Sequence, residues 1–346
     1  MAHNIHFNEQ TGKHSFFSVN EKPWHGLGQI VNEYPTSKQA LEYAGLNFIV
    51  EKRPLFTLNK TNDTTDLKVP EYLATVRTDT QAVLGVVGRQ YEVVQNKDAF
   101  QFFDAIVQGE GILYETAGAL GKGERIFITA KLPRYIRIGR EDLIEQYLFL
   151  TTSHDGSGSI TAAFTPVRIV CNNTLNAALK NRSNSIKIRH IANAKERLEQ
   201  AHQLVGITNT LSTELENIFN SWSKVRITDE AVLKLIQLAL VPNREVLRNI
   251  KAGKQEELSA QFTSMCNNAF EYALNSPSQQ LETTKGTLFG AYNAVTGYLQ
   301  NVRNYKSEEA KLKSLLFGGM GQQKAQAAFN LCADYAANGD SILYLN

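Results

Sequence analysis

The sequence has few cysteines, no long hydrophobic run and no familiar catalytic motif. Its 346 residues include three cysteines, Cys171, Cys266 and Cys332, and no C-x-x-C pair. Such a sparse, odd set favours reduced thiols over disulfides, so we expect a cytoplasmic protein. No stretch reaches the roughly 18 consecutive apolar residues of a membrane-spanning helix, so we expect no membrane partner. The polar, histidine-rich start also lacks the pattern of a signal peptide.

Motifs of common catalytic sites are missing as well. The sequence contains neither G-x-S-x-G nor H-E-x-x-H. Ser153, His154 and Asp155 are adjacent in the chain. Neighbouring strand residues point to opposite faces, so these three cannot form a triad together. Cys171 is better explained as a buried structural cysteine than as a nucleophile. We therefore assign no catalytic residue and no cofactor.

Histidines cluster near the N-terminus, where metal binding has to be considered. Four of the seven lie there, at His3, His6, His14 and His25. No carboxylate or cysteine spacing typical of a metal site accompanies them. Surface or turn positions explain these histidines better, so we assign no metal site.

What the sequence does contain is the composition of a globular protein. Hydrophobic residues make up 42% and charged residues 20%, with a net charge of +2. This length suits one large domain or two domains. Apolar residues alternate as in strands before about Ala192, and afterwards recur every three or four positions as in helices. We predict an α+β fold: residues 1–192 form an α+β domain of antiparallel hairpins with packed helices, and residues 193–346 form an all-helical domain.

Individual elements can also be predicted. Turn residues separate three pairs of strands: 72–77 with 82–87, 112–117 with 125–132, and 147–153 with 160–170. Helices are expected over 38–44, after a Ser37 cap, and over 97–107, 229–240, 256–274, 287–303 and 322–337. An apolar stripe runs from Leu198 to Trp222. It is longer than one helix needs to cover its own domain, which predicts a homo-oligomer.

Positive charge is concentrated in two stretches. No Asp or Glu occurs from Gly156 through Lys195, whereas this stretch carries Arg168, Lys180, Arg182, Lys187 and Arg189. An anionic partner would explain this asymmetry, and a solvated surface would explain it equally well. In the second stretch Arg134, Tyr135 and Arg137 interleave basic and aromatic side chains. That pattern suits a nucleic-acid track, or an edge strand kept soluble by charge.

Several motifs resemble one known family. The segment Phe164-Thr165-Pro166-Val167-Arg168-Ile169-Val170-Cys171-Asn172-Asn173-Thr174-Leu175 is similar to the central signature of the phage and plasmid proteins catalogued as domain of unknown function 932 (DUF932). Other characteristic segments of this family are similar to four further parts of the sequence: the start Met1-Ala2-His3, the turn 24–28, the segment 292–303 and the turn 318–321. The resemblance implies a mobile genetic element in a bacterial host. It transfers no catalytic residue, since the family's activity is not established.

These observations favour a nucleic-acid-binding protein. We expect it to bind or anneal single-stranded DNA in replication or recombination of the element. The site residues would be Arg134, Tyr135, Arg137, Arg168, Lys180, Arg182, Lys187 and Arg189. Two alternatives stay open. One is a protein-interaction module, such as an anti-restriction or host-takeover factor, in which the helical half docks a partner. The other is an enzyme acting on nucleic acid with His154 and Asp155 at its loop edge.

Overall fold

The computed structural model describes most of the chain. The described stretches are residues 5–20, 26–58, 66–107, 112–165, 185–190, 202–306, 310–311, 314–315 and 319–344. Contacts divide the chain into two compact units. Unit 1 comprises Met1–Pro133, Tyr147–Phe164 and Ser185–Ile207, and unit 2 comprises Arg134–Gln146, Thr165–Asn184 and Thr208–Asn346. The domain boundary expected between residues 192 and 193 stays a prediction.

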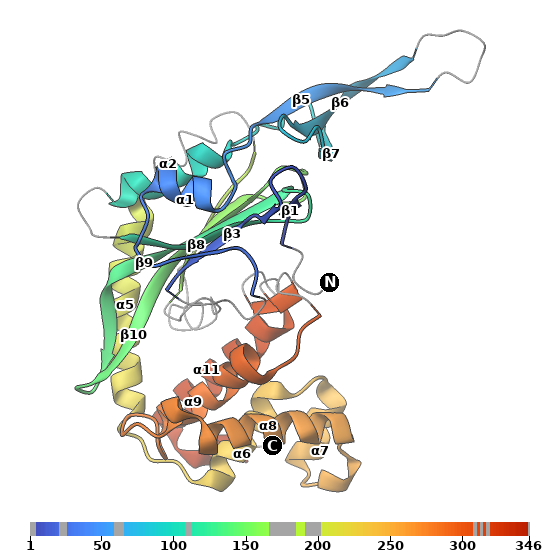
Figure 1. Ribbon diagram of the computed structural model, residues 1–346. Helices are drawn as coiled ribbons and strands as arrows, with labels where there is room; N and C mark the ends of the chain where they lie inside the picture. Colours follow the sequence, from blue (N-terminus) through green and yellow to red (C-terminus); the bar gives the residue numbers. More distant parts are fainter. Residues whose placement is uncertain are drawn as a thin grey trace. The chain divides into compact units, whose positions relative to one another are not determined.

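The main sheet has seven strands in the order β12-β11-β10-β9-β8-β3-β4 (Figure 1). Their bounds are β3 Phe16–Val19, β4 Gln29–Val31, β8 Leu113–Leu120, β9 Arg125–Ile138, β10 Asp142–Ser153, β11 Ile160–Thr165 and β12 Ser185–Ile188. The antiparallel pairing of β8 with β9 is as predicted. At the edge, however, β3 pairs parallel with β4. The sheet therefore contains more than antiparallel hairpins, because two parallel strands cannot be joined by a hairpin and require a crossover connection.

The central strands of unit 1 are buried on both faces. Residues 126–130 of β9 and 147–153 of β10 are all buried. Their sequences are continuous apolar and β-branched runs, which suit strands covered on both sides. Helix α1 (Ser37–Tyr43) packs against β3, β8 and helix α2 (Asn96–Val107). A capping box between Thr36 and Gln39 starts α1, so the cap lies one residue before the predicted Ser37.

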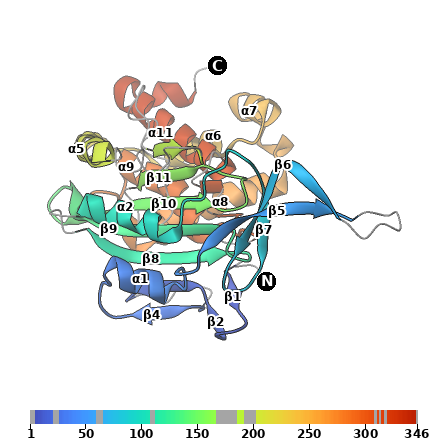
Figure 2. The ribbon, with the colours of Figure 1, turned by 90° about the horizontal axis from the view of Figure 1, so that it is seen from above.

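A second sheet in unit 1 forms an arm. It contains β5 (Val50–Thr57), β6 (Leu67–Arg77) and β7 (Val83–Gly88), in that order. The β6–β7 pairing is the predicted hairpin. Figures 1 and 2 show β5 and β6 continuing as a two-stranded ribbon past the end of β7. A short hairpin of β1 (Phe7–Asn8) and β2 (Lys13–His14) completes the described strands of this unit.

Unit 2 is mostly helical. Its helices are the second part of α5 (His202–Trp222), α6 (Asp229–Leu240), α7 (Arg244–Lys251), α8 (Ala260–Asn275), α9 (Leu288–Gly297) and α11 (Met320–Asn338). Side-chain oxygens of Thr228, Asn243, Ser259 and Thr287 cap four of them. Aromatic rings fill the core, with ring centroids 4.8 Å apart for Trp222 and Phe329 and 5.0 Å apart for Phe219 and Phe289.

The chain is therefore a mixed α+β protein with strands in its N-terminal part and helices in its C-terminal part, as predicted. The β-structure extends beyond simple hairpins, because it includes a parallel edge pair and a separate arm. Leu215 and Trp222 of the predicted association stripe are buried within the chain itself. That part of the stripe is thus intramolecular core. Among the described residues, no helix is long and apolar enough to cross a membrane.

Candidate functional site

The predicted nucleic-acid-binding residues have different positions in the structure. Arg168, Lys180 and Arg182 lie outside the described residues. Lys187 is in β12, where only its backbone is described, and Arg189 is exposed just after that strand. The other three residues, Arg134, Tyr135 and Arg137, share the outer part of β9 in unit 2.

On this part of β9, exposed and buried side chains alternate. Tyr135 and Arg137 are exposed, whereas Ile136 and Ile138 are buried. Since successive strand residues point to opposite faces, Tyr135 and Arg137 lie on one face. Arg134 is exposed as well, but it lies two residues before Ile136 and therefore on the same face as Ile136. The three residues therefore do not follow a single face of the strand.

The turn that follows β9 is fixed to helix α5. The Arg137 backbone N–H donates to Glu216 Oε2 over 3.0 Å, and the Gly139 N–H donates to Asn220 Oδ1 over 2.9 Å. Gly139 has a φ of +62°, a left-handed conformation that favours glycine. On the far side of the turn, Thr283 Oγ1 donates to Asp142 Oδ2 over 2.6 Å. The β9–β10 turn is therefore held to two other segments of unit 2.

Next to this turn lies a cavity of about 780 Å³, here called the turn cavity. Basic side chains from separate segments line it, namely Arg140 from the turn and Lys224 and Arg226 from the connection after α5. Carboxylates of Glu141, Asp142 and Glu282 also line it. One further cation lies close by, since Arg137 Nη1 donates to the Arg140 carbonyl oxygen. Arg226 is held in place by donating from Nη1 to the Lys285 carbonyl oxygen. Sequence reasoning missed Lys224 and Arg226, because two cations after a helix show no periodicity.

A second cavity of about 200 Å³ in unit 2, here called the ring pocket, has an aromatic and amide lining. The aromatic side chains are Phe219, Tyr272, Phe289 and Tyr292, and the polar ones include Asn293, Thr296, Gln300 and Asn301. Asp142 and Leu281 line both the ring pocket and the turn cavity. The two cavities are therefore adjacent. Burial raises the pKa of the Asp142 carboxyl, although its hydrogen bond from Thr283 partly offsets that effect.

A π-helical turn shapes the ring pocket. Helix α9 ends at Gly297 and continues as a wider turn over Tyr298–Val302, which carries Gln300 and Asn301 to the pocket. The sequence predicted one uninterrupted helix over 287–303. Gly297 lies so close to the Tyr272 ring that a Cβ there would clash with it. Short π-helical turns occur frequently at functional sites. The sequence carried no signal for this turn other than the glycine.

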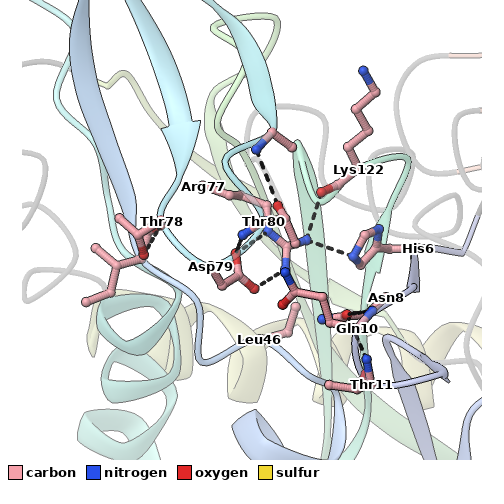
Figure 3. A network of polar contacts seen from close by, with 12 residues as sticks. His6, Asn8, Gln10, Thr11, Leu46, Arg77, Thr78, Asp79, Thr80 and Lys122 are labelled. Atoms are coloured by element: carbon pink, nitrogen blue, oxygen red, sulfur yellow. Dashed lines mark hydrogen bonds and ion pairs between the residues drawn. The ribbon is translucent and has the colours of Figure 1, made fainter.

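Unit 1 contains a buried polar cluster around Arg77, which is 1% exposed (Figure 3). Its guanidinium donates to Asp79 through Nε at 3.0 Å and Nη2 at 2.7 Å. Nη1 lies 2.9 Å from His6 Nε2 and 2.8 Å from the Lys122 carbonyl oxygen. The group also lies 3.8 Å from the ring centre of Phe48. Because nearly every N–H is used within the protein, Arg77 ties β6 to the main sheet and is not available to a ligand.

His154, considered in the enzyme alternative, is buried in unit 1. Its Nε2 lies 2.8 Å from Asn96 Oδ1, and Asn96 Nδ2 donates to the Leu46 carbonyl oxygen. This orientation of Asn96 makes Nε2 the protonated nitrogen of His154. Its Nδ1 is buried without a hydrogen-bond partner in the described structure. Burial, with smaller contributions from nearby His190 and Arg77, lowers the pKa of His154 to about 3. A neutral, enclosed imidazole fits a structural role.

Fold and cavities together define a mixed α+β protein with two adjoining ligand-sized cavities in its helical unit. By its sequence it belongs to the family described as domain of unknown function (DUF932), whose model matches residues 83–316, more than half of the chain. No curated protein and no solved structure matches the chain. The matched span includes the β9–β10 turn and both cavities, whereas His6 and Arg77 lie outside it.

Proposed function

We propose that the protein binds single-stranded nucleic acid, chiefly through unit 2. It would bind or anneal single-stranded DNA in the replication or recombination of a phage or plasmid. One observation carries the proposal: basic side chains from separate chain segments, Arg140, Lys224 and Arg226, line a single cavity beside the β9–β10 turn. Clustered cations that contact phosphates release counterions, which is the main source of affinity for nucleic acid.

The neighbouring surface of β9 suits a single strand better than a duplex. Tyr135 is 44% exposed and shares its face of the strand with Arg137. An exposed aromatic ring can stack on an unpaired base, and such stacking is worth about 1–3 kcal/mol per base. In a duplex the bases are already stacked on each other. Tyr135 would therefore contribute to binding of single strands only.

Carboxylates limit the strength expected of this site. Glu141, Asp142 and Glu282 face the same cavity and repel phosphates. The acid-free stretch with Arg168, Lys180, Arg182, Lys187 and Arg189 would then supply further phosphate contacts. A homo-oligomer would repeat both basic segments along one strand. We therefore propose modest affinity for each protomer and tighter binding by an assembly.

Retention of labelled oligonucleotides on filters tests this proposal. Single- and double-stranded DNA and RNA of equal length are compared at about 50 mM and about 200 mM salt. We expect retention of the single strands, weakened by the higher salt, and less retention of the duplexes. No retention of any of them at the lower salt contradicts the proposal.

A protein-interaction module is the second candidate, and the arm of unit 1 favours it. Large apolar side chains of the arm and its flanks are exposed, including Phe56, Leu58, Leu67, Tyr72, Val83 and Val86. Exposed apolar patches of this kind mark surfaces that bind other proteins. Under this alternative, replacing Phe56 and Leu67 by Ser abolishes capture of a host protein, and nucleic acid is not retained on filters.

A further inference from the structure

The ring pocket lies beside the turn cavity and shares Asp142 and Leu281 with it. We infer that the ring pocket binds one unpaired nucleobase of a strand whose phosphates lie along the turn cavity. This inference rests on the proposed function and specifies which part of the ligand is recognised. It assigns one cavity to the base and the other to the sugar-phosphate backbone.

The size of the ring pocket suits a single base. An apolar cavity of about 150 Å³ holds benzene, whereas sites for drug-sized ligands measure roughly 300–1,000 Å³. At about 200 Å³, the ring pocket is close to the first value. A complete nucleotide would have to leave its sugar and phosphate outside. The adjoining turn cavity, at about 780 Å³ and with Arg140, Lys224 and Arg226 around it, can take them.

The polar lining of the ring pocket suits the edge of a base. Asn293 and Gln300 are half-buried, and within the described structure their side-chain amides have no hydrogen-bond partner in the protein. Each amide offers one donor group and one acceptor side by side. This arrangement matches the adjacent donor and acceptor on a base edge, as in the pairing of Asn or Gln with adenine. Unpaired bases are read in this way, through hydrogen bonds to their edges.

The aromatic lining offers a stacking surface. Phe219, Phe289 and Tyr292 are almost completely buried, whereas Tyr272 is half-buried. The Tyr272 hydroxyl is held by Asn301 Nδ2 at 3.2 Å and by Ser278 Oγ at 3.3 Å. These contacts fix the ring before a ligand arrives. A fixed aromatic ring loses little conformational freedom on binding, which favours stacking with a planar base.

The test compares two strands of equal length, one carrying bases and the other abasic throughout. Variants Asn293→Ala and Gln300→Ala remove the amides without breaking a hydrogen bond of the protein. Asn268→Ala is the matched control, because Asn268 is exposed on α8 and does not line the pocket. Wild-type protein should bind the strand with bases about tenfold or more tightly than the abasic strand. Both pocket variants should reduce this ratio without changing the affinity for the abasic strand, and the control should leave the ratio unchanged.

Two results would overturn the inference. One is equal affinity of the wild type for both strands, and the other is a ratio that neither pocket variant alters. Either result leaves phosphate binding at the turn cavity standing, since the backbone is still bound. Equal affinity for the two strands would in addition contradict the stacking proposed for Tyr135. If neither strand is retained at about 50 mM salt, the proposed function itself is wrong and the pocket has no role in it.

Discussion

Asn220 on helix α5 fixes Arg137 at the outer end of β9. Its Nδ2 donates to the Arg137 carbonyl oxygen over 2.7 Å, while its Oδ1 accepts the Gly139 N–H over 2.9 Å. The Asn220 side chain thus joins the residue before Ile138 to the residue after it, at the start of the turn. We therefore expect this bridge to help position Arg140 at the turn cavity.

Removing the bridge should loosen the turn. Asn220→Ala loses two hydrogen bonds to the turn, and because both bonds are exposed to solvent we expect a stability loss of only about 1 kcal/mol. Affinity for single-stranded DNA should fall more noticeably, since Arg140 is no longer held in place. Thermal unfolding and filter binding measure the two effects, with Asn268→Ala as the control. Unchanged DNA affinity together with lower stability would contradict the positional role of Asn220.

Acid should destabilise unit 1. Burial lowers the pKa values of His6, His154 and His190, that of His154 to about 3. Below about pH 6.5 the unfolded chain takes up protons that the folded chain does not. The free energy of unfolding therefore decreases as the pH is lowered, by about 1.4 kcal/mol per pH unit for each such histidine. For His154 this loss continues down to about pH 3.

Urea unfolding at different pH values measures this loss. Between pH 7 and pH 5, His154 alone should reduce the unfolding free energy by about 2 kcal/mol, and His6 and His190 should add to it. The sign is fixed, because all three folded pKa values lie below the unfolded ones. Equal stability at pH 7 and pH 5 would show that these histidines are not buried as described.

Arg77 should matter far more for stability than a surface arginine. Arg77→Met leaves the buried His6 Nε2 and the Lys122 carbonyl oxygen without their partner, and an unsatisfied buried group of this kind costs about 1–3 kcal/mol. Asp79 also loses its partner, but its carboxylate is exposed and adds less. Arg89→Met is the matched control. Arg89 is exposed, and its ion pair with Glu71 at 3.6 Å is worth at most about 1 kcal/mol. Similar urea midpoints for the two variants would contradict the structural role of the Arg77 cluster.

Local patterns predicted much of the fold. The β8–β9 and β6–β7 hairpins follow from turn residues between β-branched runs, and the Thr228 cap marks the start of α6. The parallel β3–β4 pair could not be predicted, because these strands have only four and three residues, too few to show alternation. The Leu215–Trp222 part of the stripe looked like an oligomer seam, since periodicity does not reveal which chain covers an apolar face.

The candidate site was only partly predictable. Arg134, Tyr135 and Arg137 stood out as interleaved basic and aromatic residues. Lys224 and Arg226 did not, since folding, and not spacing, brings them to the same cavity as Arg140. The ring pocket could not be found either, because its side chains come from β10, α5, α8, α9, the π-helical turn and the connection before α9. Convergence of distant positions leaves no local pattern.

The central claim, that phosphates contact the turn cavity, is tested most directly by the salt dependence of a charge-reversal variant. The double variant Arg140→Glu and Arg226→Glu is compared with wild type and with Arg244→Glu, an exposed change on α7 away from the cavity. For a single strand, each phosphate contact contributes about 0.7 to the slope of log affinity against log salt. The account predicts that the double variant flattens this slope by at least about 1.4, while Arg244→Glu leaves it as in wild type. Equal slopes for all three proteins would contradict it.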